Sequence, residues 1–514
     1  MLLIHPPAVK PSEPPAGLAA LSGALSGALH ACAVGHTLLD ANLEGMLWLL
    51  QRGPSGPQDT FTRRACRNLP ADLAFLRSRQ GYGDHSRYGK AVIEVNRVLG
   101  RSASGPVRLS LADYTHGLLS PVKSEDLLYA AEHPEENPFF PYFSARLPEL
   151  LDAAEGPALA GLSLNYLSQA LCAFAIIGFL RRAYPRLKIV LGGGLVTSWT
   201  ANPAWRDPFR GLVDHLVAGP GEVPLLALAG VEIDERAFPP RFDGLPLDLY
   251  LGPRFILPYA GSRGCYWRRC SFCPEKAEAR AFSPRPPAQA TADLARLSAL
   301  LRPALIHFVD NALSPALMAA IPKTPPASPW YGFARLTADL ADPDYCRALR
   351  ASGCAMLKLG LESGDQDVLD ALGKGIDLPT AERVLAALKQ AGIATYVYLL
   401  FGTPAEDRAS AMRTLAFVSR LSPSIDFLNL AIFNLPLNSP EARTLERRTF
   451  YAGDLSLYTD FVHPRGWDRG AVRRFLEGEF KRDPAIRPVV LRQPPIFTSN
   501  HAPFFALHRE DLSG

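Results

Sequence analysis

Six short apolar segments alternate with helical stretches in the middle of the chain, and this alternation constrains the fold more than any other feature. The expected helices lie at 287–301, 340–352, 378–391 and 406–420. The expected strands are 255–262, 304–312, 330–336, 355–363, 394–402 and 425–433. Short apolar strands that alternate with helices form a parallel sheet with both faces covered. Six such units predict a partial (β/α)6 barrel, with functional groups at the carboxyl ends of its strands.

A second alternation precedes the first and predicts a separate α/β domain. Its expected strands are 2–7, 35–42, 159–167, 187–194 and 213–222, and its helices include 17–30 and 169–185. We predict a Rossmann-like parallel-sheet domain at 1–222, with a mostly helical insertion at about 45–150. A proline-rich linker is expected at 223–250, and the barrel at 251–433. The C-terminal region at 434–514 is a candidate substrate cap.

Composition narrows the setting of the protein. The chain has 514 residues, a net charge of +4 and eight cysteines. The charge is too small to indicate nucleic-acid binding, and aromatic and basic residues do not alternate along a stripe. The apolar segment 17–35 is expected to be a buried helix, so we predict no targeting or membrane-spanning segment. Few cysteines with one tight cluster favour a reducing, cytoplasmic location.

Three of the cysteines, Cys265, Cys270 and Cys273, lie within nine positions after the first barrel strand. A structural zinc site needs four ligands, and His307 and Cys346 lie on other units without such pairing. A disulfide would leave one cysteine over. Three thiolates that hold a [4Fe–4S] cluster, with one iron open, fit the spacing best.

The segment "RGCYWRRCSFC" resembles the cysteine motif of radical S-adenosylmethionine (SAM) enzymes that carry an N-terminal cobalamin-binding domain. The usual family spacing is C-x-x-x-C-x-x-C, and this chain has one residue more in the first interval. The later segments "HFVDNALSP", "YGFAR", "LGLESGDQDVLDALGKG" and "YLLFGTPAED" resemble later strands of the family in order. In that family SAM chelates the open iron, and its reductive cleavage gives a 5′-deoxyadenosyl radical.

The resemblance implies SAM-binding roles for residues at four strand ends and in the cysteine loop. These residues are Phe272, Asp310, Asn311, Arg335, Glu362, Ser363, Gly402 and Glu406. Several have a structural alternative: packing for the aromatic ring, helix capping for the 310–311 pair, and an ion pair for the arginine. At the fifth strand the structural reading is favoured, with Gly402 as a turn and Glu406 in the first turn of a helix.

The glycines at the ends of the N-terminal strands are the candidate cobalamin contacts, because small residues let a corrinoid approach the backbone. They are Gly192, Gly193, Gly194, Gly219 and Gly221, each of which has simple turn formation as an alternative. The histidine motif D-x-H-x-x-G is absent, and His215 is expected to precede a strand. Cobalamin is therefore expected to bind without a histidine ligand.

The resemblance implies methylation of an unactivated carbon, with a small molecule or peptide as substrate. Radical rearrangement or cyclisation without methyl transfer is an alternative, as is a non-catalytic iron–sulfur or corrinoid redox protein. A flavodoxin or ferredoxin is expected to supply electrons at Arg263, Arg268 and Arg269. The sequence assigns no catalytic residue and no roles to Tyr458, Trp467, His501 or His508 of the tail.

Overall fold

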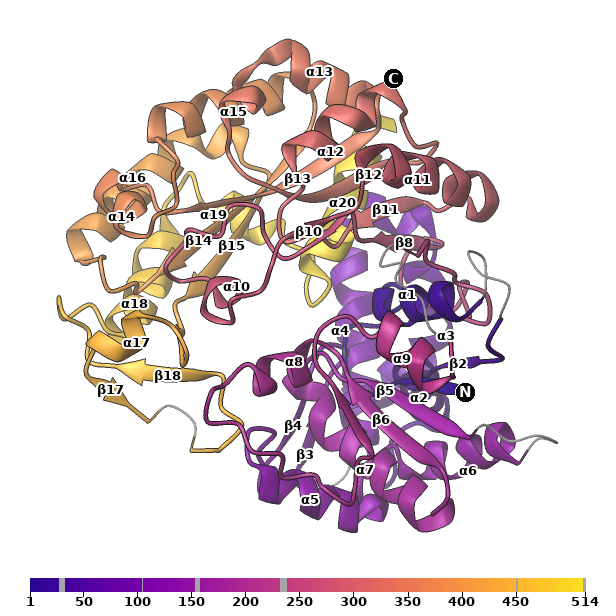
Figure 1. Ribbon diagram of the computed structural model, residues 1–514. Helices are drawn as coiled ribbons and strands as arrows, with labels where there is room; N and C mark the ends of the chain where they lie inside the picture. Colours follow the sequence, from indigo (N-terminus) through magenta and orange to yellow (C-terminus); the bar gives the residue numbers. More distant parts are fainter. Residues whose placement is uncertain (27–32, 104, 153–157, 232–237, 450–451, 512–514) are drawn as a thin grey trace. The chain divides into compact units, whose positions relative to one another are not determined.

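The computed structural model divides the chain into two compact units (Figure 1). Unit 1 comprises Met1–Phe255 with Tyr451–Ser456, and unit 2 comprises Ile256–Phe450 with Leu457–Gly514. The structure describes residues 1–26, 33–103, 105–152, 158–231, 238–449 and 452–511. Within these residues, no helix combines the length and apolar character needed to cross a lipid bilayer.

Unit 1 is built on a parallel sheet of five strands in the order β2-β1-β5-β6-β7. The strands are β1 (Leu2–His5), β2 (Thr37–Asp40), β5 (Leu159–Ser163), β6 (Lys188–Gly192) and β7 (His215–Val217). Their residues are largely buried apolar side chains, as expected for a parallel sheet covered on both faces. The predicted N-terminal α/β architecture is confirmed.

The helices of unit 1 follow the predicted alternation closely. Those that follow the sheet strands are α1 (Ala16–Leu25), α7 (Leu167–Ala183), α8 (Gly194–Thr200) and α9 (Glu222–Leu228). The end of the helix expected at 17–30 lies outside the described residues. The insertion is mostly helical, with α2 (Ala41–Arg52), α3 (Thr60–Leu76), α4 (His85–Ser102), α5 (Ser124–Glu132), α6 (Phe140–Leu151) and a hairpin of β3 (Val107–Leu109) and β4 (Tyr114–His116).

The segment expected as a linker at 223–250 packs on unit 1 where the structure describes it. Helix α9 occupies its start, and Phe242 and Leu245 are buried further along. The Tyr250 hydroxyl donates a 2.6 Å hydrogen bond to Oδ2 of Asp40 at the end of β2. The described part of this segment is therefore packed as part of unit 1. Its proline-rich composition without periodicity does not reveal these contacts.

Unit 2 contains the second parallel sheet, in the order β15-β14-β13-β12-β11-β8. Its strands are β8 (Ile256–Tyr259), β11 (Leu305–Phe308), β12 (Trp330–Ala334), β13 (Cys354–Glu362), β14 (Ala394–Phe401) and β15 (Phe427–Ile432). All neighbours pair in parallel. The predicted partial (β/α)6 barrel is confirmed, and every carboxyl end lies at one edge.

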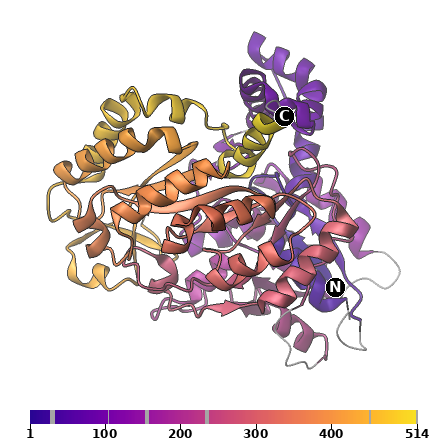
Figure 2. The same ribbon diagram turned by 90° about the horizontal axis from the view of Figure 1, so that it is seen from above.

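Register places alternate residues of unit 2 on two faces. Phe333, Lys358 and Tyr396 form one row on the inner face, whereas Leu359 and its neighbours in the rows between face outward. The helices that follow the strands lie over the outer face (Figures 1 and 2). They are α11 (Pro287–Leu301), α12 (Pro315–Ala320), α13 (Pro343–Ala351), α14 (Gln366–Ala371), α15 (Leu378–Gln390) and α16 (Arg408–Leu421).

The C-terminal region contains more structure than the sequence predicts. The helix expected at 468–481 is α18 (Arg469–Gly478). A small antiparallel sheet and three further helices accompany it: β16 (Leu435–Pro436), β17 (Arg447–Arg448), β18 (Tyr458–Phe461), α17 (Glu441–Thr444), α19 (Arg487–Leu491) and α20 (Thr498–Asp511). Thr498 and Ser499 at the start of α20 hydrogen-bond to Tyr396 and Tyr398 of the inner face. The last helix was missed because Pro503 interrupts its pattern.

Candidate functional site

The three clustered cysteines lie on one loop at the carboxyl end of β8. Strand β9 (Ser262–Arg263) pairs with β10 (Ser283–Pro284) at the start of this loop, and α10 (Pro274–Ala277) begins directly after Cys273. Cys270 is buried, and Cys265 and Cys273 are half-buried. We call residues 261–273 the cysteine loop.

The charges around the cysteine loop suit thiolate ligands. Burial raises the pKa of the Cys270 thiol, whereas the charges of Lys374 and Arg335 act to lower it. Burial also raises the pKa of Cys273, against the backbone N–H groups of Glu275 and Lys276. The Cys265 thiol also raises the pKa of Cys270, and both of these thiols raise the pKa of Cys273, so the three lie close enough to interact. Among the described residues no three His, Cys, Asp or Glu side chains lie at metal-binding spacing. The donor set of three thiols beside two cations nevertheless has the chemistry that an anionic iron–sulfur cluster needs.

Asp310 secures the start of the cysteine loop. Its carboxylate accepts hydrogen bonds from the Gly261 N–H at 2.8 Å and from the Ser262 hydroxyl at 2.6 Å. Burial raises the pKa of Asp310 to about 6 although these bonds oppose the shift. Asp310 therefore positions the cysteine loop, a role that differs from the SAM contact and the helix capping considered from the sequence. The neighbouring residue Asn311 is exposed.

Arg335 and Glu362 meet at a third residue, Lys374, which the sequence did not single out. The Lys374 ammonium lies 2.7 Å from Oε1 of Glu362, and both side chains are largely buried. Arg335 donates a hydrogen bond to the Lys374 carbonyl and stacks 4.0 Å from the ring of Trp267. Glu362 adopts a positive φ of 68°, which is strained for a residue with a side chain. Strain of this kind is typical of functional sites.

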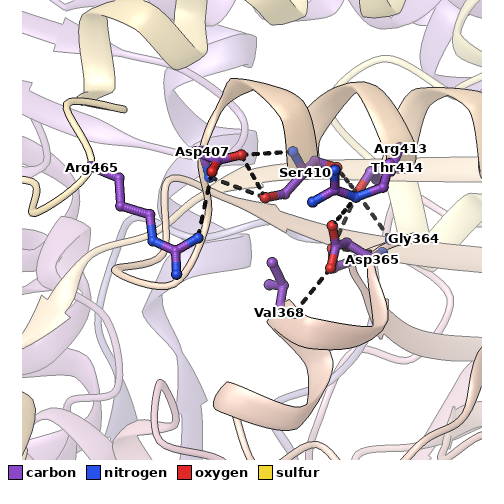
Figure 3. A network of polar contacts seen from close by, with 9 residues as sticks. Gly364, Asp365, Val368, Asp407, Ser410, Arg413, Thr414 and Arg465 are labelled. Carbon is purple, nitrogen blue, oxygen red and sulfur yellow. Dashed lines mark hydrogen bonds and ion pairs between the residues drawn. The ribbon is translucent and has the colours of Figure 1, made fainter.

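Ser363 bonds to a polar network at the carboxyl end of β13, of which Asp365, Arg413 and Thr414 are drawn in Figure 3. Its side chain is fully buried, and its hydroxyl bonds to the Thr414 hydroxyl at 3.1 Å and accepts from the Asp365 N–H. Asp365 in turn accepts from Arg413 of α16 and caps α14 through Val368. These bonds use the Ser363 hydroxyl to join the end of β13 to α16.

Gly402 and Glu406 form a tight turn after β14. The Gly402 N–H donates to Oε2 of Glu406, which also accepts a 2.9 Å hydrogen bond from the Trp467 ring nitrogen. Burial raises the pKa of Glu406 to about 8, and Oε1 has no hydrogen-bond partner among the described residues. His463 Nε2 contacts the carbonyl oxygen of Thr403 at 2.9 Å. His463 and Trp467 of the C-terminal region thus stabilise this turn by hydrogen bonds.

A small pocket of about 100 Å³ connects the turn to the cysteine loop. It is lined by Ser271, Phe272, Ala371, Leu372, Pro404, Ala405, Phe433 and Glu441. Phe272 also packs against the buried cluster of Phe433, Leu435, Ala442 and Phe461. Both roles considered for Phe272, packing and contact with a flat ligand, are compatible with this place. Cys273, Phe272 and the 402–406 turn therefore border one region of unit 2.

The glycines of unit 1 differ in what surrounds them. A Cβ on Gly193 would lie 2.3 Å from the Leu164 carbonyl oxygen, so the fold itself requires this glycine. Gly192 and Gly221 are close to Val217 and Leu21. At Gly194 the nearest atom is 3.7 Å away, and at Gly219 nothing lies within 4 Å. Of the five, Gly219 faces open space, and at Gly194 an added Cβ would make only an ordinary van der Waals contact.

His215 begins β7 rather than preceding it, and its side chain is exposed. The correction follows from pairing: His215 is aligned with Val190 in the sheet register. In the tail, Trp467 contacts Glu406, whereas His501 is buried and stacked on Phe497. Tyr458 lies in β18, and burial raises its pKa.

Comparison with known proteins decides the assignment of unit 2. Residues 259–418 match the profile of the Radical SAM superfamily. They form a radical SAM domain. The match starts at the last residue of β8 and includes the cysteine loop and four further strands. A radical SAM domain implies SAM and a [4Fe–4S] cluster, and the cysteines of this domain fit the cluster as described above.

Solved structures show the same fold around the radical SAM domain. The cobalamin-dependent SAM radical enzyme OxsB with aqua-cobalamin has a TM-score of 0.53 at 15% identity, covering 65% of this chain. The radical SAM methyltransferase TsrM from Kitasatospora setae, with cobalamin and a [4Fe–4S] cluster, has a TM-score of 0.53 at 18% identity, covering 73% of this chain and 90% of TsrM. The chain spans about 60% of the length of OxsB. No curated protein sequence matches the chain.

Sequence reasoning missed Lys374 and Trp267, which border the cysteines, and Glu441 in the pocket. The glycines of "LGKG" around Lys374 were the available signal, because glycines with positive φ often mark a close backbone approach. Nothing in the sequence around Glu441 indicates a site.

Proposed function

We propose that the protein is a cobalamin-dependent radical SAM enzyme that methylates an unactivated carbon. The observation that carries the proposal is the cysteine loop of the radical SAM domain, which lies beside Arg335, Lys374 and the strained Glu362. A [4Fe–4S] cluster with an open iron supplies one-electron cleavage of SAM when bound. The substrate is expected to be a small molecule or a peptide.

The chain's own residues divide the binding of SAM among themselves. Cys265, Cys270 and Cys273 would hold the cluster, and Glu362 offers carboxylate oxygens to ribose hydroxyls. The pocket beside Phe272 is the place for the adenine ring, because it joins an aromatic wall to the backbone of the 402–406 turn. The assignments of Asn311 and Ser363 receive no support from their positions.

Cobalamin is proposed for unit 1 on two grounds. The carboxyl end of β7 is followed by open space at Gly219, and the carboxyl end of β6 is followed by Gly194, where an added Cβ would make only an ordinary contact with Asn165 at 3.7 Å. The two similar structures were solved with cobalamin bound. Cobalamin supplies a carrier for the methyl group when bound. The sequence lacks the D-x-H-x-x-G motif, so we propose that no histidine ligates cobalt.

The test uses the anaerobically reconstituted protein with SAM, with and without cobalamin under reducing conditions. Methyl transfer predicts that the protein retains close to one cobalamin and forms S-adenosylhomocysteine only when cobalamin is present. Formation of 5′-deoxyadenosine without any S-adenosylhomocysteine would favour rearrangement or cyclisation instead. A protein that retains cobalamin and a cluster but converts no SAM would be a redox carrier.

The electron donor is the remaining part of the proposal. Arg263, Arg268 and Arg269 are exposed on the cysteine loop, and Arg269 also stacks 4.8 Å from Trp267. A flavodoxin or ferredoxin carries acidic surface charge, which such a group would attract.

A further inference from the structure

The cysteine loop rests on a short segment, Leu372–Gly375, between α14 and α15. The Ser271 N–H donates to the Leu372 carbonyl at 2.9 Å, and the Trp267 ring nitrogen donates to the Gly373 carbonyl at 2.9 Å. Two residues of the loop, one on each side of Cys270, are thus bonded to consecutive carbonyls of one segment. We call Leu372–Gly375 the seat of the cysteine loop.

The glycine at the end of the seat is required by this contact. A Cβ on Gly375 would lie 2.1 Å from the Trp267 ring, and its φ of 64° is left-handed. At the other side of the loop backbone, a Cβ on Gly373 would lie 2.9 Å from the Arg269 carbonyl oxygen. The seat and the cysteine loop therefore approach too closely for a side chain at position 373 or 375. This close contact restricts the position of Lys374, which lies between the two glycines.

Lys374 is the one residue of the seat with a charged side chain, and it points to the cysteines' side of the loop. Its ammonium lies 2.7 Å from Oε1 of Glu362 and 5.6 Å from the ring centre of Phe272, the residue directly before Cys273. The side chain is 8% exposed, so water screens its charge little. The positive charge of Lys374 also acts to lower the pKa of the Cys270 thiol.

We propose that Lys374, fixed on the seat, stabilises the reduced iron–sulfur cluster and sets its reduction potential, with Glu362 acting in the opposite direction. The inference rests on the proposed function, because it takes the cluster from the radical SAM assignment. The step is the transfer of one electron from an external low-potential donor to the cluster, with no bond made or broken. Reduction adds negative charge to an anionic group, so a nearby cation favours it and a nearby anion opposes it.

The experiment is a redox titration of the reconstituted, SAM-free protein, followed by electron paramagnetic resonance of the reduced cluster. At the wild-type midpoint, Lys374→Met is expected to lower the ratio of reduced to oxidised cluster about tenfold, which is about 59 mV for one electron. Glu362→Gln is expected to raise the potential. The double variant should return to within about threefold of the wild-type ratio, because the two charges lost are opposite.

The matched control is Lys389→Met, which removes the same charge from the same unit. Lys389 lies at the far end of α15 and pairs with Asp426 at 4.0 Å. The helical residues from Leu378 to Leu388 lie between the two lysines and span about 16 Å along the helix axis. Lys389→Met is expected to leave the potential unchanged.

Two results would overturn the proposal: shifts of the same sign in Lys374→Met and Glu362→Gln, or a Lys374→Met shift no larger than that of Lys389→Met. If Lys374→Met does not hold a cluster, Lys374→Arg and Glu362→Gln decide. The first must stay near the wild-type potential and the second must rise, and any other pattern rejects the inference. A wild-type protein without a cluster would reject the proposed function as well.

Discussion

The buried carboxyl group of Glu406 gives the stability of unit 2 a specific pH dependence. Its pKa is raised to about 8 by burial, whereas an unfolded glutamate titrates near about 4.3. The folded protein therefore binds this proton more tightly than the unfolded chain. The resulting stabilisation is complete below about pH 4 and is lost as the pH rises through 8. Between pH 6 and 8 the loss amounts to about 2 kcal/mol.

The substitution Glu406→Gln removes the titration and keeps an oxygen that can accept from Gly402 and Trp467. The assay is urea unfolding at pH 6, 7 and 8, followed through the transition of unit 2. We expect the free energy of unfolding of the wild type to fall by about 2 kcal/mol relative to Glu406→Gln over this range. Glu382→Gln, at an exposed residue paired with Arg420, is the control and should run parallel to the wild type. If the difference in unfolding free energy between the wild type and Glu406→Gln stays constant within about 0.5 kcal/mol from pH 6 to pH 8, Glu406 is not protonated in the folded protein.

Three further predictions concern the cofactors and the electron donor. Gly194→Leu adds a bulky side chain after the carboxyl end of β6 and should weaken cobalamin retention at least about tenfold, measured by absorbance after gel filtration, whereas Gly35→Leu should retain cobalamin. Unimpaired retention in Gly194→Leu would place the ligand elsewhere. Charge reversal of Arg268 and Arg269 should lower turnover with flavodoxin more than with dithionite, and equal losses would reject docking there. Asp310→Ala leaves the Gly261 N–H and the Ser262 hydroxyl without their acceptor and should lower the iron content after reconstitution. A full cluster in that variant would show that the loop does not need Asp310.

The sequence was sufficient for the architecture and for the place of the cysteine loop after the first barrel strand, because both depend on local patterns. Apolar strands alternating with helices specify a parallel sheet wherever they occur, and three cysteines in nine positions are visible without a structure. The approximate strand ends follow from the same alternation, whereas the strand order of each sheet comes from the structure.

The partners of the site residues could not be read from the sequence, because they are set by contacts between distant segments. Lys374 meets Glu362 only because α14 turns the chain back, and Trp467 reaches Glu406 from 61 positions away. Ser363 was expected at a ligand, but its hydroxyl bonds to Thr414 on another helix. Likewise, what makes Gly193 obligatory is the Leu164 carbonyl of a neighbouring strand end.

The most direct test of the account is the fate of SAM when the reconstituted protein is reduced by one electron. The products are separated by chromatography and identified by mass. The account predicts 5′-deoxyadenosine and methionine in the wild type, and neither product when Cys265, Cys270 and Cys273 are all replaced by alanine. A wild-type protein that holds a reducible cluster and binds SAM, yet leaves SAM intact after reduction, would contradict the account.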